Sequence, residues 1–244
     1  MKVIFFDLDG VLSSKAHCIL MAEMINREEN LYNILRKVSN SADNLELEWI
    51  IKEVVKLFKN KPESLLKNTG EKLSIMKGAA KTIKILKDNG YTPILVTNGI
   101  EQVAGVFARR LNIPEWHGNT VEIKNGKITG RLCASPLVTL HSKGDVVRNI
   151  IAQKSSKKTV AVGNDVNDWS MFQETEISIL FNPPLNLESH LKWWLDRTKK
   201  EFAQGITHSP VNIIIEEPDL RLILPFLVPV TYLEKSEQKI KLLL

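Results

Sequence analysis

The chain begins with the run Met1-Lys2-Val3-Ile4-Phe5-Phe6, and Asp7-Leu8-Asp9-Gly10 follows directly. Apolar β-branched and aromatic residues in an unbroken run are typical of a strand buried on both faces of a parallel sheet. Two aspartates therefore stand at the carboxyl end of that strand, where open α/β sheets bind their ligands. Two buried carboxylates require a partner, so we expect a cation or a shared proton beside them. An acidic turn that pivots on Gly10 is the simpler alternative.

The composition is that of an ordinary globular protein. The 244 residues are 43% hydrophobic and 25% charged, which is enough for one large domain with or without a smaller one. Two cysteines, Cys18 and Cys133, make no disulfide framework and favour a reducing compartment. No signal-peptide pattern and no run near the ~20 apolar residues of a membrane span is present. We therefore expect a cytoplasmic protein without a membrane partner.

The net charge of +5 arises from 33 basic and 28 acidic residues. A basic balance can indicate nucleic acid or anionic ligands. The lysines are scattered, however, with one short cluster at Lys154, Lys157 and Lys158, and no aromatic residues alternate with them. We therefore expect no nucleic-acid partner.

Residues 13–75 have a different pattern from the segments on either side. Their apolar residues recur at helical spacing in three groups: Ile19, Leu20, Ala22 and Ile25; Leu31, Ile34 and Leu35; and Ile50, Ile51, Val54, Val55 and Phe58. This pattern predicts an all-helical insertion after the first strand, which forms a lid over the ligand crevice or, alternatively, a structural unit on one edge of the sheet. We expect His17, near its start, at the surface, with contact to a substrate as the alternative.

An α/β pattern resumes after this segment. It predicts buried strands over 92–96, 159–162, 177–181 and 211–215, and helices over 79–88, 102–111, 141–151, 169–172, 188–202 and 219–226. Alternating residues around Asn125-Gly126 predict a β-hairpin over 120–132 with a type I′ turn. The predicted class is α/β, with a Rossmann-like three-layer α/β/α core built on a parallel sheet, an inserted helical cap and a small β-hairpin flap.

These elements divide the chain into three parts. Residues 1–12 and 76–227 form the predicted α/β core, and residues 13–75 form the helical cap inserted after the first strand. Residues 228–244 form a C-terminal tail, and its apolar end would pack on the core or on another subunit.

Three of the predicted strands end in polar clusters: Asp7 and Asp9; Thr97 and Asn98; and Asn164, Asp165 and Asp168. Such strand ends lie side by side in a doubly wound sheet. Several carboxylates at one edge favour a hard divalent cation, and oxygen ligands with room for water suit Mg²⁺. The hydroxyl and backbone amides of Thr97–Gly99, with a lysine near a helix start, suit a phosphate group. The residues alone thus predict a Mg²⁺-assisted site for a phosphorylated ligand.

Four short motifs carry a resemblance to a known family. Asp7-Leu-Asp-Gly-Val-Leu12, Thr97-Asn-Gly99, Lys143 and Gly163-Asn-Asp-Val-Asn-Asp168 follow one another in the order of the motifs of the haloacid dehalogenase-like hydrolase superfamily. The early helical segment and the predicted hairpin are most similar to its phosphoserine-phosphatase-like branch. The resemblance extends from residue 1 to about residue 227. It implies a phosphatase that uses Mg²⁺ and acts on a small phosphorylated metabolite.

The resemblance also implies roles for individual residues. Asp7 would be the nucleophile that forms an aspartyl-phosphate, and Asp9 would protonate the leaving oxygen and then activate water. Lys143 would neutralise charge on Asp7 and the phosphate. The substrate would be bound by Leu8, Thr97, Asn98, Gly99 and Lys143. Mg²⁺ would be held by Asp7, the Asp9 carbonyl and an acidic residue of the last motif.

The last motif departs from the pattern of the branch. The usual Gly-Asp-Gly-x-Asn-Asp is Gly163-Asn164-Asp165-Val166-Asn167-Asp168 here, so the usual ligand position holds Asn164 and the acidic group is shifted by one. Either the Asn164 amide oxygen coordinates the ion or Asp165 does, and the charge of Asp165 favours the latter. Asn167 and Asp168 would lie behind the ligands, with Asp168 bonded to Lys143 or to a metal-bound water.

A second departure concerns the substrate. Phosphoserine phosphatases carry an acidic residue at the cap start for the substrate ammonium, whereas Ser13-Ser14-Lys15-Ala16-His17 has none. We therefore expect a leaving group that is anionic or neutral. The function predicted from the sequence is a Mg²⁺-dependent phosphatase that hydrolyses a small phosphomonoester through an aspartyl-phosphate. The alternatives are a phosphotransferase or phosphomutase on the same fold, or a non-catalytic regulatory protein, for which Asn164 is the argument.

Overall fold

A seven-stranded sheet forms the centre of the computed structural model, which describes residues 1–36, 44–133, 137–139, 142–183, 210–229 and 241–242. Its strand order is β3-β2-β1-β6-β7-β8-β9. The bounds are β1 Lys2–Phe6, β2 Tyr91–Ile100, β3 Glu115–Asn119, β6 Lys158–Gly163, β7 Ile177–Phe181, β8 Ile213–Ile215 and β9 Lys241–Leu242. Every pair is parallel except β8 with β9. The order reverses around β1, which places Asp7 at the crevice between β2 and β6.

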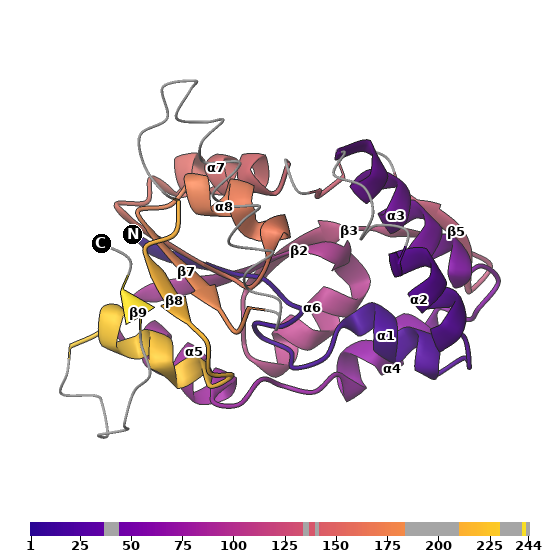
Figure 1. The fold of residues 1–244 in the computed structure, drawn as a ribbon, viewed down its shortest axis with the longest axis horizontal. Helices are drawn as coiled ribbons and strands as arrows, with labels where there is room; N and C mark the ends of the chain where they lie inside the picture. The colour runs from indigo at the N-terminus through magenta and orange to yellow at the C-terminus, as the bar shows by residue number, and fades with distance from the viewer. Residues whose placement is uncertain (37–43, 134–136, 140–141, 184–209, 230–240, 243–244) are drawn as a thin grey trace.

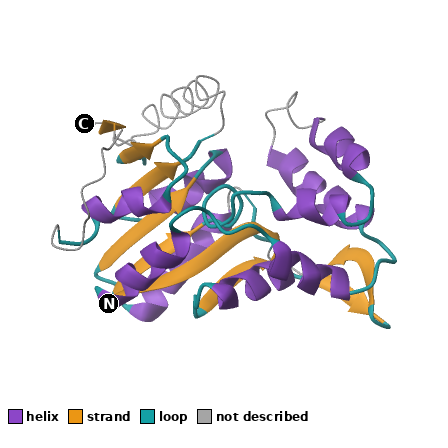
Figure 2. Cartoon of the chain, turned by 90° about the horizontal axis from the view of Figure 1, so that it is seen from below, coloured by secondary structure: helices purple, strands orange, loops and turns teal. Residues whose placement is uncertain are grey.

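Helices cover both faces of this sheet, which gives three layers (Figure 2). The side chains of β1 alternate between two apolar cores, because successive residues of a strand point to opposite faces. Ile4 and Phe6 pack with α5 (Ala79–Asp88), α6 (Glu101–Arg110) and the 3₁₀ helix η2 (Leu220–Phe226). Val3 and Phe5 pack with α7 (Ser142–Lys154) and α8 (Trp169–Gln173). The predicted Rossmann-like α/β/α fold is confirmed.

The helical insertion lies at one end of the molecule, beyond α6 (Figure 1). It contains α1 (His17–Glu23), α2 (Glu28–Arg36), α3 (Asn44–Leu57) and α4 (Ser64–Lys72), which share a third apolar core. Its two ends run side by side, since the Ser14 amide donates to the Ser74 carbonyl at 3.1 Å and the Met76 amide to the Leu12 carbonyl at 2.8 Å. The division of the chain into core, cap and tail stays a prediction.

The hairpin forms as predicted, from β4 (Val121–Lys124) and β5 (Lys127–Leu132). Asn125 and Gly126 have φ values of 50° and 70°, the positive values that a type I′ turn requires at both central residues. The hairpin is hydrogen-bonded to the loop before α4. The Asn60 amide donates to the Ile128 carbonyl at 2.8 Å, and the Glu63 amide donates to the Gly126 carbonyl at 2.9 Å. The hairpin therefore adjoins the helical insertion.

Three features differ from the predictions. Strand β2 continues past Val96 to Ile100, with a register shift against β3, so residues 97–99 form an irregular stretch within a strand. Strand β3 was not predicted because its sequence, Glu-Trp-His-Gly-Asn, lacks the apolar run of a buried strand. The last helix is the 3₁₀ helix η2, which contains Pro225. The predicted helix over 188–202 lies outside the described residues.

The end of the tail adds a short strand to the sheet. Ile213 pairs with Leu242, and Ile214 pairs with Lys241. Packing of this apolar end on the core was one of the two predicted alternatives. Residues 230–240 lie outside the described part of the chain.

Candidate active site

Lys143 occupies the centre of the candidate site, in the first turn of α7. Its side chain is 0% exposed, and its Nζ lies 2.8 Å from Asp7 Oδ1 and 2.5 Å from Asp168 Oδ1. Asp7 follows β1, and Asp168 ends the 3₁₀ helix η1 (Val166–Asp168) that follows β6. Three elements distant in sequence thus place one buried ammonium between two carboxylates. Each buried charge has an opposite charge beside it, as buried ions require.

Burial governs the protonation of this cluster. It raises the pKa of Asp7 to about 8, and the Asp168 and Asp9 carboxylates add to the rise, while the Lys143 ammonium opposes it. Burial disfavours the charge of Lys143, but Asp168 and Asp7 outweigh this effect and raise its pKa. Lys143 therefore stays charged, whereas Asp7 needs additional positive charge to be fully ionised near neutral pH.

The turn after β6 holds Asp168 in place. The backbone amides of Asn164 and Asp165 donate to Asp168 Oδ2 at 2.7 and 3.3 Å. Asp165 caps η1, because its Oδ1 accepts from the Asn167 amide at 2.7 Å and its Oδ2 from Asn167 Nδ2 at 3.1 Å. Burial, together with the Asp168 charge, raises the pKa of Asp165 to about 6. Both oxygens of Asp165 are thus engaged within its own turn.

Asn164 lies against the loop of the two aspartates. Gly10 has a φ of 82°, and a Cβ built on it would stand 2.1 Å from Asn164 Nδ2, so the absence of a side chain at Gly10 makes room for the Asn164 carboxamide. In the described ranges, no three side chains of His, Cys, Asp and Glu are arranged to hold a metal ion. Whether Asn164 or Asp165 would bind a metal ion stays a prediction.

The stretch of β2 with the register shift presents the predicted phosphate-binding residues. Thr97 is 2% exposed, and its Oγ1 accepts a hydrogen bond from the Gly99 amide at 3.0 Å, which leaves the hydroxyl proton for another acceptor. The Leu8 side chain is buried in the apolar core, so only its backbone can contact a substrate. Bulges of this kind often lie beside active sites, where they redirect side chains.

Asn119 supports this stretch and was not predicted. Its Nδ2 donates to the Asn98 carbonyl at 2.6 Å and to the Val138 carbonyl at 2.9 Å, and its Oδ1 accepts from the Val138 amide at 2.9 Å. The side chain is 2% exposed. Asn119 is the last residue of β3. The polar sequence of this strand gave no sign of a strand, so Asn119 was not singled out.

His17 is buried, contrary to the expectation of a surface histidine. Only 4% of it is exposed, and its Nδ1 lies 2.7 Å from Asp9 Oδ2. Burial opposes a charge on the ring, but the Asp9 carboxylate outweighs this effect and raises the pKa of His17. The amide of Ile100 favours the neutral ring of His17. It donates to Nε2 at 3.2 Å, which is possible only while that nitrogen carries no proton.

The described site residues thus fall into two groups. Asp7, Lys143 and Asp168 are joined by direct contacts, and Asp9 is bonded to His17. Of the remaining predicted residues, Thr97, Asn98 and Gly99 lie in the irregular stretch of β2. Leu8 follows β1, and Asn164, Asp165 and Asn167 lie in the turn and the 3₁₀ helix η1 after β6.

A family model described as haloacid dehalogenase-like hydrolase matches residues 1–174. The chain belongs to this family. A phosphoserine phosphatase of Methanocaldococcus jannaschii is 26% identical over 230 residues, which are 93% of this chain and 97% of that protein. These findings confirm the predicted superfamily, its phosphoserine-phosphatase-like branch and the prediction of a phosphoric monoester hydrolase.

Two solved phosphoserine phosphatase structures are similar to the fold. One is described as a phospho-aspartyl intermediate analogue and has a TM-score of 0.74 at 26% identity, covering 93% of this chain and 99% of that one. The other is a substrate-bound complex with a TM-score of 0.75 at 25% identity, covering 93% and 98%. Both likenesses extend over nearly the whole chain, the helical insertion included.

Proposed function

We propose that this phosphatase hydrolyses a small phosphomonoester with the help of Mg²⁺ through a phosphorylated Asp7. The observation that carries the proposal is the burial of Lys143 between Asp7 and Asp168, at 2.8 and 2.5 Å. A buried ammonium beside a carboxylate at a strand end can neutralise the charge that repels a phosphate dianion from an anionic nucleophile. A similar structure is described as a phospho-aspartyl intermediate analogue, which supports a covalent step.

Each residue has a task in this proposal. Asp7 attacks phosphorus, and the leaving oxygen receives a proton from Asp9, which then removes a proton from the water that hydrolyses the aspartyl-phosphate. Lys143 favours the ionised form of Asp7 and contacts the transferred group. The Thr97 hydroxyl donates to a phosphoryl oxygen, with the amides of Asn98 and Gly99 beside it.

The residues around Asp7 fit Mg²⁺. The Asp7 carboxylate, the Asp9 carbonyl and the Asn164 amide oxygen would hold it, all of them the hard oxygen donors that this ion prefers. Bound there, Mg²⁺ would supply positive charge to the phosphoryl oxygens. Asp7 and Asp168 share the single ammonium of Lys143, so a cation beside Asp7 would favour the ionised carboxylate that a nucleophile requires.

The proposed substrate is not free phosphoserine, although the similar proteins are named for it. In this chain Ala16 precedes α1, and the Glu23 carboxylate of that helix is paired with Lys15 Nζ at 2.5 Å. Residues 13–17 contain no carboxylate side chain that could bind a substrate ammonium. The proposed substrate is a small phosphorylated metabolite whose leaving group is anionic or neutral.

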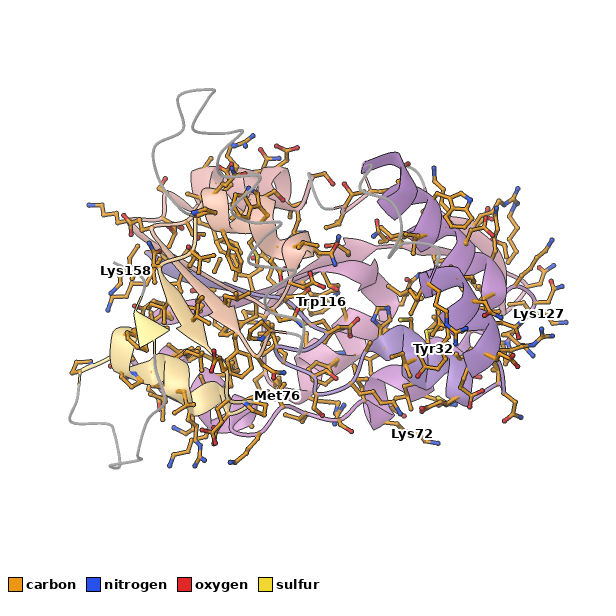
Figure 3. The ribbon with its side chains drawn as sticks, viewed as in Figure 1. Tyr32, Lys72, Met76, Trp116, Lys127 and Lys158 are labelled. Carbon is orange, nitrogen blue, oxygen red and sulfur yellow. The ribbon has the colours of Figure 1, made fainter. Side chains whose placement is uncertain are left out.

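The proposed location is the cytoplasm. Cys18 and Cys133 are both free thiols, as expected in a reducing compartment. No helix in the described parts of the chain has the length and apolar character needed to cross a membrane. Lys127 and Lys158 lie at opposite ends of the molecule (Figure 3), so these two lysines do not belong to one basic surface.

Phosphate release from 4-nitrophenyl phosphate tests the proposal. We expect turnover with Mg²⁺, little after chelation, and a loss of ~10⁴-fold or more in kcat for Asp7→Asn. Asp145→Asn is the matched control, because Asp145 is exposed and paired with Arg148 in the same region of α7. Nitrophenol release with the phosphate passed to an added alcohol would indicate a phosphotransferase. No Mg²⁺-dependent turnover would contradict the proposal.

A further inference from the structure

His17 makes two hydrogen bonds to the same carboxylate. Its backbone amide donates to Asp9 Oδ1 at 2.9 Å, and its ring Nδ1 lies 2.7 Å from Asp9 Oδ2. Both oxygens of Asp9 are thus contacted by one residue, at the first position of α1. A carboxylate held at both oxygens cannot rotate about its Cβ–Cγ bond without breaking one of these contacts.

The third contact of His17 determines which ring nitrogen carries the proton. The Ile100 amide is a donor, and it points at Nε2 at 3.2 Å, so Nε2 acts as the acceptor. The proton of the neutral ring then resides on Nδ1 and is donated to Asp9. The backbone of β2 therefore fixes the tautomer in which His17 can hold Asp9.

The ring is placed by close packing as well. A Cβ built on Gly99 would stand 2.1 Å from His17 Cε1 and 2.7 Å from Nε2, so the ring occupies the space that any other residue at position 99 would fill. The ring thus packs between the loop of Asp9 and the proposed phosphate-binding stretch of β2. Its side chain is 5% exposed, whereas that of Asp9 is 26% exposed, so Asp9 still reaches the solvent-accessible side.

We infer that His17 is a positioning residue for Asp9, an inference that rests on the proposed function. A general acid contributes only when its proton is aimed at the leaving oxygen. His17 fixes the direction of the Asp9 carboxylate through Nδ1–H and ties that direction to the β2 stretch on which the phosphoryl group would bind. It does not itself contact the substrate.

The leaving group distinguishes positioning from a general structural role. Nitrophenolate leaves without a proton, whereas an alkyl alcohol needs one, so loss of acid catalysis affects alkyl esters selectively. The value of kcat/KM reports only the steps up to departure of the leaving group, and it therefore isolates Asp9 as an acid from its later role as a base.

The test compares three substitutions of His17 on 4-nitrophenyl phosphate and glycerol phosphate with Mg²⁺ present. His17→Leu removes the donor, and we expect kcat/KM to fall ~100-fold for the alkyl ester but no more than ~3-fold for the aryl ester. His17→Asn places an amide N–H where Nδ1 stands, and it should restore the alkyl activity to within ~5-fold of the parent. His17→Gln places its amide near Nε2 instead, and it should resemble His17→Leu.

His117→Leu is the control, because this half-buried histidine of β3 contacts Glu115 at 3.0 Å and has no proposed role in the reaction. Equal losses on the two substrates in His17→Leu, or His17→Asn no better than His17→Gln, would overturn the inference. If His17→Leu does not fold, the comparison of the Asn and Gln variants still decides. Failure of the proposed function differs from these outcomes, because the parent protein would then turn over neither ester.

Discussion

The carboxyl end of the sheet and the start of the helical insertion meet at Asp9, but their charged side chains are held very differently. At the sheet, Lys143 and Asp168 are both 0% exposed and are joined at 2.5 Å. At the start of the insertion, Lys15 and Glu23 form an equally short pair with side chains that are 37% and 35% exposed. Removal of one partner from a buried ion pair is strongly destabilising, whereas an exposed ion pair contributes little to stability. The buried pair at the sheet should therefore contribute far more to stability than the exposed pair at the start of the insertion.

The largest expected effect lies on the sheet side. Lys143→Met leaves Asp7 and Asp168 buried without their counter-charge, so we expect the free energy of unfolding to fall by ~3–5 kcal/mol. We also expect kcat to fall ~10³-fold, because the repulsion between Asp7 and a phosphate dianion is no longer offset. Chemical denaturation and the nitrophenyl phosphate assay measure the two effects. A stable, active variant would remove the basis of the comparison.

The next largest effect is expected at the two candidate Mg²⁺ ligands, Asn164 and Asp165. Asn164→Ala should weaken Mg²⁺ activation by ~10–100-fold, since the structure places Asn164 against the aspartate loop. Asp165→Ala should mainly destabilise η1, by ~1 kcal/mol, because Asp165 acts as its cap. Titration of activity with Mg²⁺ separates the two variants. The greater loss of Mg²⁺ affinity in Asp165→Ala would restore the preference based on the sequence.

Asp219 is a paired carboxylate away from the candidate site, and it is expected to stabilise the fold. Hydrogen bonding to Arg221 lowers the pKa of Asp219 to about 2, and its side chain is 7% exposed. Such a group stabilises the fold above its unfolded pKa, and this stabilisation is lost as the pH falls toward 2. We expect Asp219→Asn to reduce the free energy of unfolding by ~1–2 kcal/mol at pH 7, with unchanged kcat.

The difference between Asp219→Asn and the parent should shrink as the pH falls below about 4. Urea denaturation at several pH values measures it. A difference that stayed constant down to pH 2.5 would show that the charge of Asp219 is not the cause.

The smallest effect is expected at the exposed pair. Lys15→Gln should change the free energy of unfolding by no more than ~0.5 kcal/mol, since half-exposed ion pairs are weak. The comparison with Lys143→Met in the same denaturation experiment is direct, because both substitutions remove one lysine from a pair of 2.5 Å. Destabilisation of similar size in both variants would contradict the distinction between the two regions.

The sequence predicted what depends on short-range pattern and missed what depends on contacts between distant residues. Asp7 and Asp168 were predicted from the polar clusters that follow apolar strands, and Lys143 from its place in the order of the family's motifs. His17 was misjudged because its partner Ile100 lies far along the chain. Strand β3 was missed because its edge position tolerates polar residues, and the register shift at residues 97–99 depends on that strand.

The choice between Asn164 and Asp165 stays a prediction, and the structure adds contacts that the sequence could not show. Charge alone favoured Asp165, but the capping geometry of a three-residue helix directs this carboxylate toward Asn167. Only the folded turn shows that Asn164 faces Gly10.

Identification of the phosphorylated residue tests the central claim most directly. The protein is mixed with Mg²⁺ and a nitrophenyl ester, quenched in acid within the first turnover, and digested for mass spectrometry. We predict a phosphoryl group on Asp7, dependent on Mg²⁺ and lost when the sample is quenched after substrate is exhausted. A phosphoryl group on another residue, or steady turnover by Asp7→Asn, would contradict the account.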